Sequence, residues 1–122
     1  SKNGEKRGIP MSNTLVALFK DMNVRDISGK FFPISKSSVR HAFDEAVEKA
    51  RLEDFRFHDL RHTFATRLVQ NGVDVFKVKE LLGHKTITMT MRYAHHYPES
   101  LRSSVEVLDH CYNSATFGVM SN

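Results

Sequence analysis

The middle of the chain contains a pair of residues with side chains that could bind a phosphate. His58 and Arg61 are three positions apart, which places both side chains on the same side of a helix near its first turn. Free backbone N–H groups at that turn also favour an anion. The pair therefore predicts a phosphate-binding group. The ordinary alternative is a histidine that caps the helix and an arginine paired with a surface carboxylate.

A second group of candidate residues follows Leu82. Gly83 allows the backbone to turn sharply, so that His84 can project from the gap between two helices. Tyr93 comes nine positions after this histidine, and a phenol can act as a nucleophile when its neighbours accept its proton or stabilise its anion. The alternative for Tyr93 is an aromatic residue at a helix end with its hydroxyl in water.

Taken together, these residues resemble the active-site signature of the tyrosine recombinases, also called the phage integrase family. The resemblance rests on His58-x-x-Arg61, on Leu82-Gly83-His84 and on Tyr93, and it extends over residues 1–109. It implies a site-specific DNA recombinase or integrase that cuts and rejoins DNA strands through a 3′-phosphotyrosine intermediate. It implies no metal and no other cofactor.

The resemblance also implies a role for each residue. Tyr93 would attack the scissile phosphate, and Arg61 would hold its non-bridging oxygens. His58 would assist proton transfer and orientation, and His84 would hydrogen-bond the phosphate as negative charge builds up. Fixed positive groups and in-line positioning are the main requirements of phosphoryl transfer, and guanidinium and imidazole groups can supply them.

The start of the chain supplies one more candidate. Asn3-Gly4 suits a type I′ hairpin turn, and Lys2 beside it matches the family's hairpin lysine, which protonates the leaving 5′ oxygen. Lys6 is the alternative if the hairpin register is shifted. The family places a further catalytic arginine upstream of this lysine, at a point that would precede Ser1. We therefore expect a catalytic domain truncated at its N-terminus, with weak activity by itself.

The elements that must position these residues are mainly helical. Apolar spacing and capping residues predict six helices, at about 12–22, 37–52, 58–71, 73–82, 86–94 and 99–109. The third helix should bury the stripe Leu60, Phe64, Leu68 and Val69. The predicted fold is mainly α with a small β-hairpin remnant, in one domain over residues 1–110, followed by a polar tail over 111–122.

The last of these helices has an apolar stripe formed by Leu101, Val105 and Leu108. Such a stripe must be covered by this chain or by another. The resemblance implies that this segment docks on its own domain or passes to a neighbouring subunit in a homotetramer on double-stranded DNA.

Composition is consistent with a polyanionic partner. The net charge is +4 and the pI about 9.4, and residues 1–40 contain eight Lys or Arg against three Asp or Glu. No apolar run is long enough to cross a bilayer, so we expect a soluble cytoplasmic protein, bacterial or phage-encoded, with no membrane or small-molecule partner. The only cysteine, Cys111, cannot form an internal disulfide.

Two other interpretations compete with the recombinase. His58 and His62 are spaced like the ligands on a zinc-binding helix, but Asp59 stands where that motif has Glu, and a third ligand is missing. We interpret His62 as a buried or capping histidine. The second interpretation is a non-catalytic helix-turn-helix DNA-binding module centred on Gly72, which leaves the joint presence of the four candidate residues unexplained.

Overall fold

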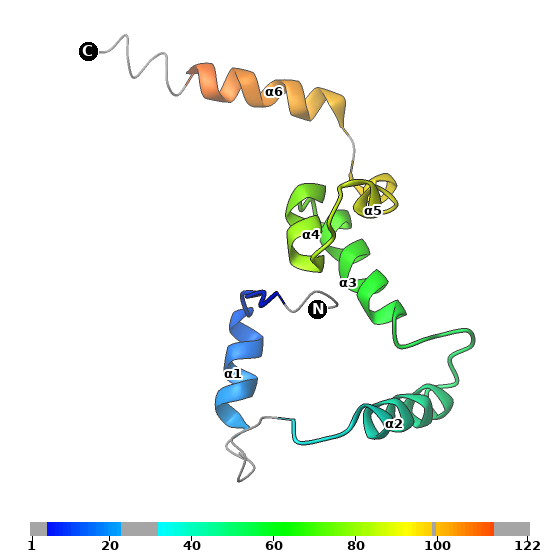
Figure 1. The fold of residues 1–122 in the computed structure, drawn as a ribbon. Coiled ribbons are helices and arrows are strands. Elements are labelled where there is room, and N and C mark those ends of the chain that lie inside the picture. The colour runs from blue at the N-terminus through cyan, green and yellow to red at the C-terminus, as the bar shows by residue number, and fades with distance from the viewer. Residues whose placement is uncertain (1–4, 23–31, 99, 114–122) are drawn as a thin grey trace.

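The computed structural model describes residues 5–22, 32–98 and 100–113, and these residues are mainly helical, as predicted (Figure 1). The helices are α1 (Asn13–Asp21), α2 (Lys36–Lys49), α3 (Asp59–Gln70), α4 (Val75–Leu82), α5 (Thr88–Met91), the 3₁₀ helix η1 (Ala94–His96) and α6 (Leu101–Cys111). No strand occurs in the described ranges. The Asn3-Gly4 turn of the predicted hairpin and Lys2 lie outside them.

Local sequence signals set several helix ends as expected. The Ser12 hydroxyl accepts a hydrogen bond from the Leu15 N–H at 3.3 Å at the start of α1. The Asp74 carboxylate does the same for the Phe76 N–H at 2.7 Å at the start of α4. Gly72 and Gly83 adopt φ values of +84° and +72° at the ends of α3 and α4, a region that favours glycine.

Other helix boundaries differ from the prediction. The second helix stops at Lys49, because Arg51 takes a left-handed φ of 53°. The predicted helix at 86–94 is split into α5 and η1, with Tyr93 in the turn between them. The last helix begins at Leu101, with Ser100 as its N-cap, slightly later than the predicted start at about 99.

A small core lies where α3, α4, α5 and η1 meet, near the middle of the molecule in Figure 1. The buried side chains are Ala65 and Val69 of α3, Val78 and Leu82 of α4, Thr90 of α5, and Tyr93. None of the residues that form α1, α2 or α6 is buried. The core therefore consists of the elements that hold the candidate site.

The predicted buried stripe of the third helix is partly wrong. Leu60 and Phe64 are 47% and 45% exposed, whereas Ala65 and Val69 are fully buried and Leu68 is partly buried. The helix packs on α4 and η1, and Ala65 and Val69 share one buried cluster with Val78 and Leu82 of α4 and with Tyr93. Small and branched side chains at that face allow the helices to approach closely.

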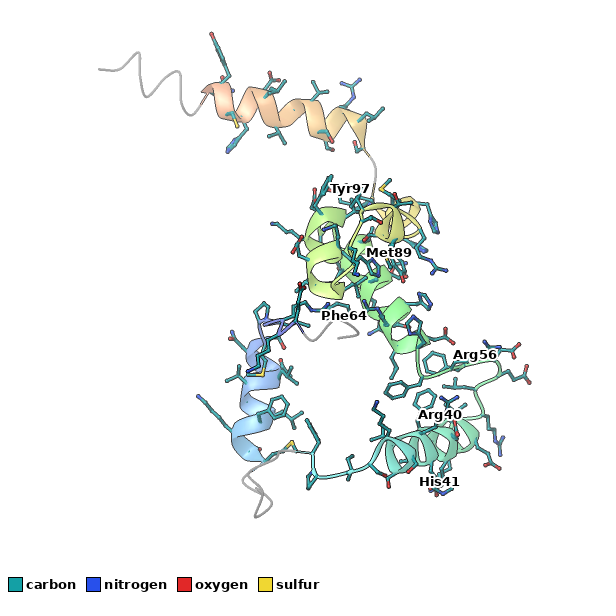
Figure 2. The ribbon with its side chains drawn as sticks, viewed as in Figure 1. Arg40, His41, Arg56, Phe64, Met89 and Tyr97 are labelled. Atoms are coloured by element: carbon teal, nitrogen blue, oxygen red, sulfur yellow. The ribbon has the colours of Figure 1, made fainter. Side chains whose placement is uncertain are left out.

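The outer helices depend on local contacts. The Phe43 ring of α2 packs edge-on against Phe57, with ring centroids 5.3 Å apart. Figure 2 places Arg40 and His41 on this helix, apart from Phe64 of α3 and Met89 of α5. Within the described residues, no helix is long and apolar enough to cross a membrane.

The apolar stripe of α6 is uncovered in the single chain. Leu101, Val105 and Leu108 are 79%, 64% and 68% exposed, and the helix points away from the core in Figure 1. The expectation that it docks on its own domain is therefore wrong for this structure.

Candidate active site

The side chain of Arg61, a residue of α3, lies at the C-terminal end of α4. Its Nη2 donates a hydrogen bond to the backbone carbonyl of Leu82, the last residue of that helix. Arg7 Nη1 donates to the same carbonyl at 3.2 Å. Two guanidinium groups therefore meet beside Gly83, and Arg61 uses a backbone acceptor instead of the surface carboxylate considered as an alternative.

Gly83 suits this position because its φ of +72° is rarely adopted by other residues. A Cβ atom added there would also displace the guanidinium of Arg7. The missing side chain is what allows the Arg7 guanidinium to approach the end of α4. Arg7 precedes Leu82 by 75 positions, so no local sequence signal could have placed it here.

His84 follows directly, between α4 and α5 as predicted, and is half-buried. Its Nδ1 lies 2.7 Å from the hydroxyl of Thr90, which is fully buried. Burial lowers the pKa of His84, and the positive charges of Arg61, Arg92, Arg7 and Lys79 lower it further. A neutral His84 with Thr90 donating to Nδ1 keeps its proton on Nε2, where it can be donated to an anion.

Tyr93 is part of the core. It is only 5% exposed, and its hydroxyl lies 2.6 Å from Nδ1 of His62. The Arg92 guanidinium lies 5.8 Å from the centre of the phenol ring. The alternative of a surface aromatic residue with its hydroxyl in water is therefore wrong.

His62 connects this tyrosine to the start of α3. Its ring is in edge-on contact with that of His58, with centroids 5.0 Å apart. His58 occupies the N-cap position of α3, yet its side chain makes no capping hydrogen bond. The capping role considered for His58 is wrong, and so is the capping alternative for His62, which is half-buried and bonded to Tyr93.

The structure brings the predicted residues together in two groups. Arg61 and His84 lie near Gly83. The His58 ring contacts the His62 ring, and His62 is hydrogen-bonded to Tyr93. A shallow groove of about 400 Å³ beside α3 is lined by Asp59, His62, Thr63, Thr66, Arg67 and Gln70. This groove contains none of the four predicted residues. Lys2 lies outside the described residues, and Lys6 is exposed.

Three residues near the site were not identified as functional from the sequence: Arg7, His62 and Thr90. Thr90 precedes Tyr93 by three positions, and that spacing is the one local signal that could have drawn attention to it. In the part of the chain that the structure describes, no three His, Cys, Asp or Glu side chains lie close enough to hold a metal ion.

Comparison with known proteins agrees with the motif. The model of the phage integrase family matches residues 1–100. The chain belongs to the phage integrase family. The integrase of Haemophilus phage HP1 is 36% identical over 109 residues, which cover 87% of this chain and 30% of that protein. The tyrosine recombinase XerD of Corynebacterium glutamicum is 45% identical over 71 residues, which cover 57% of this chain and 23% of XerD.

The fold agrees as well. This integrase-family chain superposes on the solved catalytic domain of bacteriophage HP1 integrase with a TM-score of 0.69 and 36% sequence identity, covering 87% of this chain and 60% of that domain. The chain spans about 30% of the length of the HP1 integrase. The fold is therefore that of part of an integrase catalytic domain.

Proposed function

We propose that this chain is the part of a site-specific DNA recombinase that contains the nucleophile, Tyr93. The observation that supports this most is the hydrogen bond between the Tyr93 hydroxyl and His62, 2.6 Å long, which joins the turn after α5 to the helix that bears His58 and Arg61. A phenol bound at that place is beside the residues that could hold a phosphate. A non-catalytic DNA-binding module has no need of such a contact.

In the proposed reaction, the phenolic oxygen of Tyr93 attacks the scissile phosphorus and the bond from phosphorus to the 5′ oxygen breaks. The products are a 3′-phosphotyrosine and a free 5′ hydroxyl. Arg61 would hold the non-bridging oxygens, and the neutral His84 would donate its Nε2–H to them as charge builds up. His58 would assist proton transfer and orientation.

The leaving 5′ oxygen must receive a proton. We assign that proton to Lys2, with Lys6 as the alternative donor. The family resemblance places a further arginine upstream of this lysine, so residues 1–110 form only part of the proposed catalytic domain. The 122-residue chain by itself should then bind DNA weakly and cleave it poorly.

The covalent intermediate provides the test. A nicked suicide substrate, from which the strand beyond the break diffuses away, should trap a protein–DNA adduct without added divalent metal. The adduct should form with the chain extended upstream through the expected arginine. Tyr93→Phe removes only the hydroxyl, so the adduct should be lost while DNA binding remains.

Tyr97→Phe is the matched control, because Tyr97 is 42% exposed and lies four positions further along the chain (Figure 2). This variant should form the adduct at the wild-type rate. Adduct formation by Tyr93→Phe, or its loss in Tyr97→Phe alone, would show that the nucleophile is assigned wrongly.

The partners follow from the same proposal. Double-stranded DNA is the substrate, in keeping with the positive charge around His84 from Arg7, Arg61 and Arg92. The uncovered stripe of α6 supports exchange of this helix with a neighbouring subunit, as in a homotetramer on DNA. The proposed setting is the cytoplasm of a bacterium, where the DNA substrate is present.

A further inference from the structure

The proton of the attacking tyrosine must go to an acceptor, and the structure offers one that the motif does not include. We propose that His62 is a catalytic residue that accepts the proton of the Tyr93 hydroxyl through Nδ1. This inference rests on the proposed function, because it takes Tyr93 to be the nucleophile.

Distance distinguishes His62 from the other histidines near the site. Its Nδ1 lies 2.6 Å from the Tyr93 hydroxyl oxygen, within direct hydrogen-bond reach. The His84 Nδ1 is engaged by Thr90 at 2.7 Å. The structure connects His58 to the tyrosine only through the His62 ring, at 5.0 Å between centroids. His62 is therefore the imidazole in contact with the reacting atom.

Burial makes this contact important. Tyr93 is 5% exposed, so bulk water has little access to its hydroxyl. A phenol that ionises there needs a built-in acceptor, since an unpartnered charge in such a place is costly. The Arg92 guanidinium lies over the phenol ring, 5.8 Å from its centroid.

The proton also has a route away from the site. His62 is half-buried and lines the groove of about 400 Å³ beside α3, together with Asp59 and Arg67. One edge of the imidazole thus faces the Tyr93 hydroxyl, and the residue borders a solvent-filled space on another. This arrangement suits a group that gains and loses a proton in each half of the reaction.

The proton moves between the Tyr93 hydroxyl and His62 in both half-reactions. Neutral His62, with its proton on Nε2, accepts the hydroxyl proton at Nδ1 while the bond from the tyrosine oxygen to phosphorus forms. The bond from phosphorus to the 5′ oxygen breaks, and that oxygen takes its proton from the separate donor assigned above. In the rejoining step, an incoming 5′ hydroxyl attacks the phosphotyrosine, and the His62 imidazolium returns its proton to the tyrosine oxygen.

The test compares His62 variants that separate proton transfer from positioning. Each variant is made in the upstream-extended chain, the form expected to give the covalent adduct. His62→Asn places an amide oxygen near the former Nδ1, so it can still accept a hydrogen bond but cannot take the proton. His62→Ala removes both functions and leaves a space that opens to the groove. His41→Asn is the matched control, because His41 is exposed on α2, apart from the site (Figure 2).

We expect single-turnover adduct formation to fall by about 10²-fold or more in His62→Asn and His62→Ala. Added imidazole should restore the rate of His62→Ala, and substituted imidazoles of higher basicity should restore it more. DNA binding should be unchanged. His41→Asn should behave as wild type.

Two results would overturn the proposal: a wild-type rate in His62→Asn, or a His62→Ala protein that no imidazole accelerates. If the wild-type protein forms no adduct on the suicide substrate, the failure lies in the proposed function itself. The two proposals can therefore be separated by the same set of reactions.

Discussion

From the contact between His62 and Tyr93 we predict how substitutions at these two residues change the free energy of unfolding. The bond is 2.6 Å long, and its two residues differ in their access to water. Tyr93 is 5% exposed, whereas His62 is half-buried beside a groove. Removing the Tyr93 hydroxyl should therefore lower the free energy of unfolding by a different amount from removing the His62 ring.

Tyr93→Phe leaves an imidazole that can turn to water in the groove. Its cost should be that of one ordinary hydrogen bond, about 1 kcal/mol in the free energy of unfolding. His62→Ala leaves the Tyr93 hydroxyl buried without this hydrogen-bond partner. Its cost should be higher, about 1–3 kcal/mol for an unsatisfied buried group, in addition to the packing lost with the ring.

The double variant tests whether these costs come from one interaction. In the combined His62→Ala, Tyr93→Phe protein, the hydroxyl is no longer stranded, so the two costs should not add. We expect a coupling of about 1 kcal/mol. The measurement is urea unfolding followed by circular dichroism for the wild type, the two single variants and the double variant, at one pH and salt concentration.

The control cycle pairs His62→Ala with Tyr97→Phe, because Tyr97 is 42% exposed. Those two costs should add to within about 0.5 kcal/mol. Additive costs for His62 and Tyr93 as well would refute the contact and, with it, the position of the nucleophile beside α3.

Three further predictions concern the rest of the structure. Burial and nearby cations lower the pKa of His84 below its ordinary value of 6.5 in the folded state. The unfolded state therefore binds a proton more readily, so the free energy of unfolding should decrease as pH falls through 6.5 and below. In urea unfolding, a His84→Asn protein should lose less stability than the wild type between about pH 7.5 and 5.5. Gly83→Ala should cost more than Gly72→Ala in thermal unfolding, because both have positive φ but only a Cβ at position 83 would displace the Arg7 guanidinium from the Leu82 carbonyl. Equal costs would mean that this Arg7 contact contributes little to stability. Val105→Asp, at a side chain 64% exposed in α6, should leave the stability of the single chain unchanged but lower the mass of its complexes with DNA in light scattering.

The sequence alone determined most of the local structure. Ser12 and Asp74 begin their helices, and Gly72 and Gly83 end theirs, through hydrogen bonds and φ values that involve only residues a few positions apart. Such interactions are determined by side-chain type and backbone geometry, so they can be identified without knowing the fold. The motif that indicated the family is also a matter of residue type and spacing.

The tertiary structure alone decided which faces are buried and which side chains meet. Apolar spacing identified a stripe on α3 but could not say that α4 and Tyr93 would join Ala65 and Val69 in the core and leave Phe64 45% exposed. The hydrogen bond between His62 and Tyr93 joins positions 31 apart, and the contact of Arg7 with the Leu82 carbonyl joins positions 75 apart. Contacts of that kind depend on how the chain folds back on itself, because helical periodicity relates only residues within a few turns of one another.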